Sequence, residues 1–294
     1  MHYDPYKDPR VIAIFNVTDI NQPTKIAGKA PWESNLWLSS IEVDGTEQEY
    51  ELSGFDVNYQ FDTIGRHTIK YTLSDNTKIG DWGFYQCLGL IEVIIPYGVT
   101  AISSDCINNL PNITSITIPN SVTTINGFNN CTGLTSIIIP NSVTTLTGFD
   151  NCTSLTSVNI PNSVTTISGF SYCTGLTSVT IPNSVTTLTG LRNCTSLTSV
   201  TISNSVTTIG TNSLSYCTGL TSITLPSSVT TIGDGVLSGC TNLTAITILA
   251  ETPPNIQSSA FGDNVTCPIY VPANSVDLYK STLPDFANRI QAIP

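Results

Sequence analysis

Apolar residues recur along the middle of the chain in a pattern that repeats every 21 to 23 residues. In the clearest copy, the alternation from Val179 to Ile181 predicts a short half-buried strand, and Pro182 ends it because proline has no backbone donor. A second extended segment begins at Val185, and Gly190 permits the tight bend that follows. The apolar positions of this copy are Cys173, Leu176, Val179, Ile181, Val185, Leu188 and Leu191. This period predicts a mainly β solenoid, in which each copy packs on its neighbours.

Eight copies align on one column, which holds cysteine in all copies except the second. The positions of this column are Cys87, Leu110, Cys131, Cys152, Cys173, Cys194, Cys217 and Cys240. One copy alone buries too few side chains to offset the conformational entropy lost on ordering its backbone. The copies are therefore expected to stack into one solenoid, and both of its open ends need a cap.

The chain before the repeats predicts a small β-sandwich-like module. Strands are expected at residues 11–18, 36–43, 49–52, 57–61 and 68–73. Asp44-Gly45 is a two-residue hairpin signal between two of these strands. We assign this module to residues 1–76 and expect it to cover the first repeat, with Trp82 and Phe84 near the junction.

The chain after the repeats predicts a cap. We assign the solenoid to residues 77–249 and the cap to residues 250–294. In the cap, the segment from Cys267 to Pro272 indicates a strand, and Asn274-Ser275 precedes a short helix with a polar N-cap.

Two motifs carry a resemblance to known families. The sequence Ile-Pro-x-Ser-Val-Thr-Thr-Ile-Gly-Asp-Gly-x-Leu-x-Gly-Cys, read from Leu225 to Cys240 with Leu in the first place, resembles the BspA-like leucine-rich repeats. The resemblance covers about residues 77–294 and implies extracellular display and a role in adhesion or host-protein binding. Copies three to six depart from that pattern because they are two residues shorter. Phe61 to Tyr71 resembles the last hairpin of small immunoglobulin-like modules, which implies such a module at the N-terminus.

Charge is scarce and uneven along the chain. The formal net charge is −11, and only 11% of the residues are charged. Residues 79–279 contain a single basic residue, Arg192, which we expect to serve solubility rather than a site. The acidic balance disfavours nucleic acid and anionic membranes as partners. No apolar run is long enough to span a bilayer, and no signal or anchor segment is visible in this chain. We expect a monomer at the cell surface or outside the cell.

Candidate chemistry is sparse. No Cys-x-x-Cys pair is present, so the nine cysteines predict buried reduced thiols rather than a metal site, although a disulfide involving Cys106 or Cys267 stays open. Both histidines, His2 and His67, lie outside the repeats, and no Gly-x-Ser-x-Gly motif accompanies them. We therefore predict neither an enzyme nor a bound cofactor or metal. A hydrolase or lyase on the solenoid is disfavoured because an acid–base pair is missing.

The outward positions of the first strand in each copy form two polar columns. They suggest a ligand-binding face, since leucine-rich-repeat proteins usually hold ligands on this side. A simpler interpretation is that β-branched threonine suits a solvated strand. A water-ordering array is disfavoured because leucine-rich strands curve. The candidate face consists of Ser136, Ile138, Ser157, Asn159, Ser178, Thr180, Ser199, Thr201, Ser222 and Thr224.

These observations favour a non-catalytic binding or adhesion protein. Its partner would be a host or matrix protein or a glycan. The alternative is a structural spacer that holds another module away from the cell surface. The near-identity of copies three to six favours this alternative, because a spacer needs no variation between copies.

Overall fold

A computed structural model describes residues 8–31, 36–50, 52–262 and 265–294. The chain forms two compact units, Met1–Leu155 and Thr156–Pro294. This division falls inside the repeats, whereas the sequence places domain boundaries after residues 76 and 249. Those two boundaries stay predictions. Both units contain turns of a β-solenoid, about nine in all, and few helices.

The first unit begins with strands that pair in two antiparallel sheets. The strands before the repeats are β1 (Val11–Val17), β2 (Thr24–Gly28), β3 (Leu38–Val43), β4 (Thr46–Gln48), β5 (Leu52–Ser53), β6 (Asp56–Tyr59) and β7 (Gly65–Leu73). One sheet contains β1, β7, β3 and β4, and the other has the order β2-β6-β5. The Tyr71 hydroxyl joins the sheets by donating to the carbonyl of Ile26 at 2.8 Å.

The strand predictions for this region are partly confirmed. Asp44 and Gly45 have φ values of 48° and 87°, as the predicted two-residue hairpin between β3 and β4 requires. The strand predicted at 49–52 is wrong, because β4 ends at Gln48 and β5 begins at Leu52. Strand β2 was not predicted. The immunoglobulin-like assignment stays a prediction.

The N-terminal strands continue directly into the first repeat. Strand β1 pairs antiparallel with β9 (Leu90–Ile94), which pairs in parallel with β11 (Ser115–Thr117). One sheet therefore has the order β11-β9-β1-β7-β3-β4, so that hydrogen bonds from β1 occupy the first edge of the repeats. Phe84 is buried here, with its ring centroid 5.3 Å from that of Trp37 and 5.4 Å from that of Tyr71. Trp82 stacks on Tyr85 instead.

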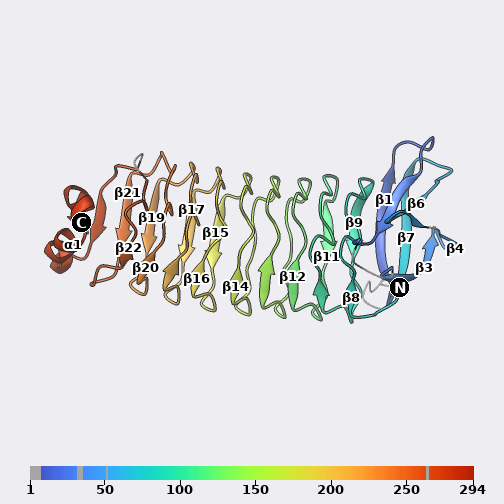
Figure 1. Cartoon of the computed structure of the whole chain (residues 1–294), viewed down its shortest axis with the longest axis horizontal. Coiled ribbons are helices and arrows are strands. Elements are labelled where there is room, and N and C mark those ends of the chain that lie inside the picture. The colour runs from blue at the N-terminus through green and yellow to red at the C-terminus, as the bar shows by residue number, and fades with distance from the viewer. Residues whose placement is uncertain (1–7, 32–35, 51, 263–264) are drawn as a thin grey trace. The chain divides into compact units, whose positions relative to one another are not determined.

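Most repeats pass through two short strand faces and an irregular third side (Figure 1). Copies three and four lack the predicted first strand, because residues 135–139 and 156–160 form only isolated bridges. In the first unit the second face contains β8 (Lys78–Ile79), β10 (Ala101–Ile102), β12 (Thr124–Asn126) and β13 (Thr145–Thr147), paired in parallel. The predicted turn between the faces is present, since the Val122 amide donates to the Pro119 carbonyl at 3.1 Å and equivalent bonds recur in later copies. Ser121 Oγ in this turn donates to the Val99 carbonyl of the previous copy at 2.7 Å.

The second unit repeats this arrangement. Its first face contains β15 (Ser178–Ile181), β17 (Ser199–Ile202), β19 (Ser222–Leu225) and β21 (Ala245–Ile248). Its second face contains β14 (Thr166–Ile167), β16 (Thr187–Leu188), β18 (Thr208–Ile209), β20 (Thr231–Ile232) and β22 (Asn255–Ile256). The parallel pairs join equivalent residues of successive copies, such as Ser178 with Ser199 and Thr187 with Thr208. The length of the sequence repeat therefore sets the register in which successive strands pair.

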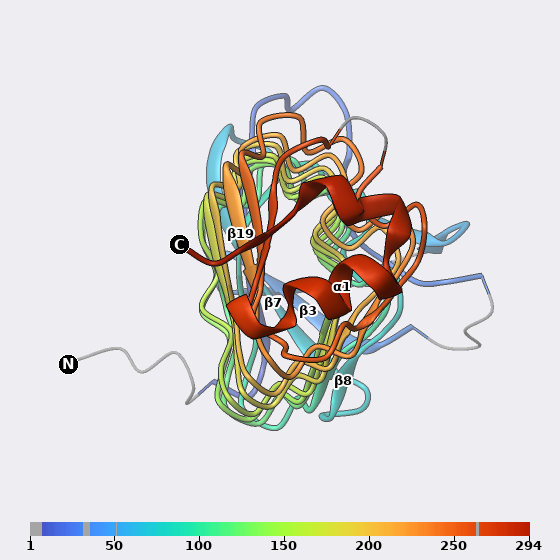
Figure 2. The same cartoon turned by 90° about the vertical axis from the view of Figure 1, so that its left-hand side faces the viewer.

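The C-terminal segment adds another strand to the predicted eight repeats before it closes the sheet. Strand β23 (Ile269–Val271) confirms the predicted strand and pairs in parallel with β21 and with β24 (Ile290–Ala292). Helix α1 (Val276–Thr282) lies between 3₁₀ helices at Ala273–Ser275 and Pro284–Arg289, across the end of the repeats of this unit (Figure 2). The helix was predicted, but Ser275 makes no side-chain cap bond. Across the described residues, none of the helices has the length and apolar character needed to cross a bilayer.

The core of the repeats is a set of stacked columns, one residue from each copy. Leu176, Val185, Leu188 and Cys194 are fully buried, as are their equivalents in most copies. The corner before the cysteine needs a left-handed backbone, and asparagine fills it in four copies: Asn109, Asn130, Asn151 and Asn193, with φ between 56° and 62°. Asparagine tolerates this conformation better than most residues. Gly148 and Gly190, with φ of 79° and 78°, make the preceding bend.

Candidate functional site

The ten residues of the candidate face are all exposed. Ser136 and Ile138 lie in the first unit, where Ile138 is 84% exposed, and the other eight lie in the second unit. There, Ser157 bridges to Ser178, and β15 and β17 bring Thr180 beside Thr201. Ser222 and Thr224 lie on β19, which contacts β17. The structure therefore places six residues on polar strands, as their spacing predicted: Ser178, Thr180, Ser199, Thr201, Ser222 and Thr224. Ser157 and Asn159 are exposed but lie outside the strands.

Hydrogen bonding separates these columns from the threonine column beside them. Thr177 Oγ1 donates to the carbonyl of Thr156 at 3.2 Å, and Thr198 Oγ1 donates to that of Thr177 at 3.1 Å. Thr244 Oγ1 likewise donates to the carbonyl of Thr221 at 2.9 Å. This neighbouring column is therefore part of the fold, because each hydroxyl joins two successive copies.

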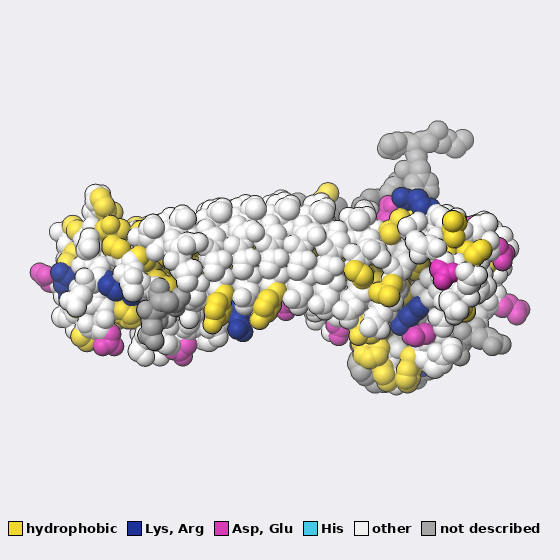
Figure 3. Space-filling view, turned by 90° about the horizontal axis from the view of Figure 1, so that it is seen from above, with side chains coloured by type: hydrophobic (Ala, Val, Ile, Leu, Met, Phe, Trp, Pro, Cys, Tyr) yellow, Lys and Arg dark blue, Asp and Glu magenta, His cyan; other side chains and the backbone are white. Residues whose placement is uncertain are grey.

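The candidate face makes no such bonds. None of its ten side chains forms a hydrogen bond within the part of the chain that the structure describes. Hydroxyls such as those of Ser178, Thr180 and Thr201 stay available to water or to a ligand. On the face visible in Figure 3, the surface over the repeats consists mainly of backbone and of side chains that are neither charged nor hydrophobic. Such a surface can offer many neutral donors and acceptors.

The cysteine column carries no reactive chemistry. All nine cysteines are buried and unbonded to one another. Buried reduced thiols were predicted for the column, and the question left open for Cys106 and Cys267 is answered in the same way. Cys131 Sγ donates to the carbonyl of Ile107 at 3.1 Å, and the thiols of later copies make equivalent bonds. Burial raises the pKa of Cys131 to about 12 and that of Cys240 to about 11. Because the thiolate is the nucleophile, these groups are inert at neutral pH.

The described histidine also has a structural position. His67 Nδ1 lies 2.6 Å from Asp44 Oδ2, and its Nε2 lies 2.9 Å from the carbonyl oxygen of Thr63. Both ring nitrogens are therefore occupied within the N-terminal strands, and His2 lies outside the described residues. Within residues 8–31, 36–50, 52–262 and 265–294, no three His, Cys, Asp or Glu side chains converge as a metal site would need.

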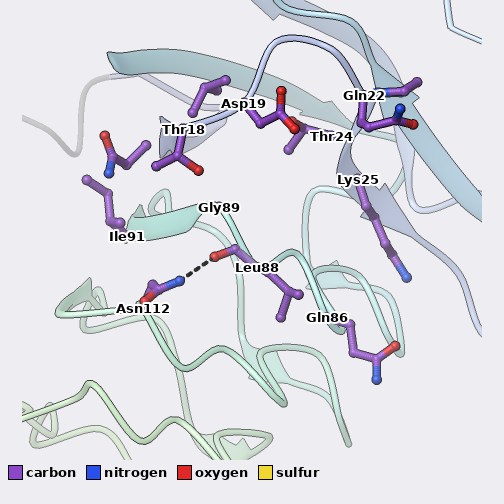
Figure 4. A pocket seen from close by; sticks show the side chains of 13 residues that line it. Thr18, Asp19, Gln22, Thr24, Lys25, Gln86, Leu88, Gly89, Ile91 and Asn112 are labelled. Carbon is purple, nitrogen blue, oxygen red and sulfur yellow. Dashed lines mark hydrogen bonds between the residues drawn. The ribbon is translucent and has the colours of Figure 1, made fainter. Parts of the chain in front are cut away.

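Sequence reasoning missed a groove in the first unit (Figure 4). It has a volume of about 560 Å³ and lies between the β1–β2 segment and the first repeats. Lys25 and Asp19 contribute from one side, and Gln86, Leu88 and Asn112 from the other. The Asn112 amide donates to the Leu88 carbonyl at 2.8 Å, which fixes one wall. No single segment signals this groove, because its walls are distant in the sequence.

Comparison with known proteins places the chain among repeat proteins. The family described as BspA type Leucine rich repeat region (6 copies) matches residues 57–169 and 147–268. A search of curated proteins finds no match.

The chain is also similar to solved structures of bacterial leucine-rich repeat proteins. A leucine rich cell surface protein from Faecalibacterium prausnitzii A2-165 is 27% identical over 69% of this chain and 68% of its own, with a TM-score of 0.52. A leucine rich repeat protein from T. pallidum is 25% identical over 63% of this chain and 74% of its own, with a TM-score of 0.45. One from Bacteroides ovatus ATCC 8483 is 20% identical over 74% and 82%, with a TM-score of 0.40. Because the family match spans more than half of the residues and the repeats stack as that family requires, the chain belongs to the BspA-type leucine-rich repeat family.

Proposed function

We propose that this protein is a non-catalytic binding or adhesion protein of the cell surface, and that the candidate face holds a protein or glycan. The observation that carries the proposal is the difference between two neighbouring columns. Thr177 and Thr198 use their hydroxyls to join successive copies, whereas Thr180 and Thr201 leave theirs free of internal bonds. Family membership supports the binding class, and the cell-surface description of the Faecalibacterium prausnitzii protein supports the location.

Because the candidate face is uncharged, its contact with a partner would depend on hydrogen bonds rather than on ion pairs. A Ser/Thr surface gives many weak hydrogen bonds spread over several strands rather than one deep pocket. Polar side chains of this kind suit a partner that presents hydroxyls or backbone amides, as glycans and extended polypeptides do. Affinity would depend on the number of copies engaged at once.

The test is an array of extracellular-matrix proteins, host surface proteins and glycans, probed with the intact chain. The informative variant combines Thr180→Lys with Thr201→Lys, which places two charges side by side on the face. The matched control combines Thr187→Lys with Thr208→Lys, which are paired in the same way on the second face. We expect the first variant to weaken binding at least about tenfold and the control to leave it unchanged.

Equal affinity of both variants and the unmodified chain would place the contact elsewhere and refute the role of this face. Equal losses in both variants would indicate a general charge effect. Thermal melting of each variant, followed by circular dichroism, separates loss of binding from loss of folding.

The spacer is the second candidate function. The segment Pro-Asn-Ser-Val-Thr-Thr recurs without change at residues 119–124, 140–145, 161–166 and 182–187, which favours it. Deletion of residues 174–194 removes one complete copy and keeps the register of the rest. A spacer would keep every activity after this deletion, whereas a binding face would lose part of its affinity.

A further inference from the structure

Two tyrosines and an arginine form a cluster on the third side of the repeats, outside the candidate face. The Arg192 guanidinium carbon lies 6.0 Å from the ring centroid of Tyr172 and 5.8 Å from that of Tyr216. The three residues come from three successive copies, all within the second unit. Tyr172 is 41% exposed and Tyr216 is 46% exposed. In Figure 3, a basic side chain flanked by apolar ones stands on the mainly uncharged surface of the repeats, with a few acidic side chains along the same edge.

The tyrosines occupy a backbone position that does not favour them. Tyr172 and Tyr216 have φ values of 62° and 59°, at the left-handed corner that asparagine fills in four other copies. A bulky residue is uncommon in this region, and unfavourable backbone conformations tend to persist where function needs them. The Tyr172 amide donates to the Arg192 carbonyl and the Tyr216 amide to the Ser238 carbonyl, both at 2.7 Å, so the corners are held firmly.

The neighbouring copies make room for this arrangement. A Cβ on Gly239, the equivalent of Tyr216 in the next copy, would lie 2.5 Å from the Tyr216 ring. The ring of Tyr216 therefore lies between Gly239 and Arg192. Rings that are held in place on either side of an arginine limit its rotamers, so less entropy is lost when its N–H groups bind an anion.

The arginine is available for such an anion. Within the described residues, the Arg192 side chain makes neither an ion pair nor a hydrogen bond, and the hydroxyls of Tyr172 and Tyr216 make no hydrogen bond. The planar guanidinium matches a carboxylate through two parallel N–H···O bonds. The cluster therefore offers one cation, two phenol donors and aromatic edges.

We propose that Tyr172, Arg192 and Tyr216 form a binding site for the carboxylate of an acidic sugar within a glycan. The single cation fits one isolated carboxylate. A polyanion or an acidic protein would be repelled by the net charge of −11 and would find no second basic residue among residues 79–279. A glycan with scattered carboxylates is repelled far less, and its neutral hydroxyls suit the amide of Asn193 at the corner between the two tyrosines.

The experiment measures binding of defined probes to the full chain by isothermal titration calorimetry. The probes are sialyllactose, its neutral counterpart lactose, galacturonic acid, a Glu-rich hexapeptide and inorganic sulfate. We expect one of the acidic sugars to bind and lactose not to bind, with an affinity that falls as salt rises. Arg192→Gln should weaken this binding at least about tenfold, and Arg192→Lys should weaken it less because the charge stays while the fork is lost.

Two further variants test the role of the tyrosines and control for a general effect of charge. Tyr172→Asn combined with Tyr216→Asn places the residue of the other copies at both corners, so folding should be retained while acidic-sugar binding falls several-fold. Lys280→Gln removes an equal charge from exposed α1 and should leave binding unchanged.

Preference for the peptide over both acidic sugars would overturn the proposal in favour of a protein partner. Binding of sulfate alone, or of none of the probes, would also overturn it. The proposal does not depend on the candidate face, and the Thr180→Lys, Thr201→Lys variant should bind the acidic sugar normally.

Discussion

The N-terminal strands and the repeats achieve their register by different means. Around the N-terminal strands, Arg10 binds Asp8 and Glu42, and Lys25 pairs with Asp56 at 2.5 Å. Further ion pairs in this part of the chain use Arg66, His67 and Lys70 of β7. In the repeats, the same hydroxyl or thiol in each copy donates to a carbonyl of the previous copy. The register of the N-terminal strands thus depends on ion pairs that each occur once. The register of the repeats depends on the same hydrogen bond recurring in successive copies.

This difference predicts where small changes are costly. Loss of one ion pair leaves the other ion pairs in place. An added side chain that pushes two stacked copies apart disturbs every hydrogen bond between them. The backbone of neighbouring copies approaches closely at the glycine bends, so that extra volume there has no room.

Substitution of the bend glycine should destabilise the repeats far more than the same substitution in the N-terminal hairpin. In Gly190→Ala, the new Cβ would lie 2.5 Å from the amide nitrogen of Gly169, and φ is +78°. We expect a loss of about 2–5 kcal/mol in the free energy of unfolding. In Gly45→Ala, φ is +87° but nothing lies within 4 Å of the Cβ, so the loss should be about 1–2 kcal/mol.

Urea denaturation checks this pair of variants. All three tryptophans lie within residues 1–82, so tryptophan fluorescence reports on the N-terminal part and circular dichroism on the whole chain. Equal losses in the two variants would contradict the idea that close contact between copies sets the cost.

The thiol column should make the repeats sensitive to alkali. Burial raises the pKa of Cys240 to about 11 and that of Cys131 to about 12, above an ordinary value of 9.0. Between these values the unfolded chain has lost a proton that the folded chain keeps, so stability falls as pH rises. Each such thiol contributes a slope of up to about 1.4 kcal/mol per pH unit above about pH 9.

Urea midpoints measured from pH 7 to pH 11 check this slope. Cys240→Ala should lower stability at pH 7 through lost packing but reduce the decline at alkaline pH. A variant that declines as steeply as the unmodified chain would show that Cys240 does not supply this part of the slope.

The ion pairs should make the N-terminal strands sensitive to acid, with a smaller effect. Hydrogen bonds from Arg10 lower the pKa of Asp8 and of Glu42. Their contribution is present at neutral pH and is lost as pH falls through the lowered pKa values of the two carboxyls in the folded chain. Because these groups are partly exposed, Arg10→Gln should remove only about 1 kcal/mol at pH 7 and clearly less at pH 3.

Tryptophan fluorescence during urea denaturation at the two pH values provides the measurement. A loss of the same size at pH 3 would mean that Arg10 acts through packing rather than charge.

The sequence predicted the repeats more accurately than the N-terminal strands, for a physical reason. The eight copies share one pattern of inward and outward residues. A prediction for one position can therefore be checked against the equivalent positions of the other copies. In the N-terminal region each strand occurs once. There, β2 (Thr24–Gly28) was missed although the Tyr71 hydroxyl bonds to it, and the segment 49–52 was wrongly predicted as a strand.

For the side chains of the repeats, too, some features could be predicted from the sequence and others could be seen only in the structure. The spacing of Ser178, Thr180, Ser199 and Thr201 predicted exposed columns, and the structure has them. The recurring Asn-Cys pair was available as a signal for the left-handed corner, but it became clear only from the φ values at Asn130 and its equivalents. The tyrosines that replace asparagine at this corner could then be recognised as exceptions.

By itself, the sequence determined the periodic part of this protein: the length of a turn, the buried columns and the polar outward face. It could do so because each copy repeats one local pattern, and stacking carries that pattern from copy to copy. Only the tertiary structure decided which hydroxyls join copies and which stay free, how β1 pairs with β9, and where a groove forms beside Leu88. Those features depend on distances between backbone atoms of separate segments, which residue identity alone does not specify.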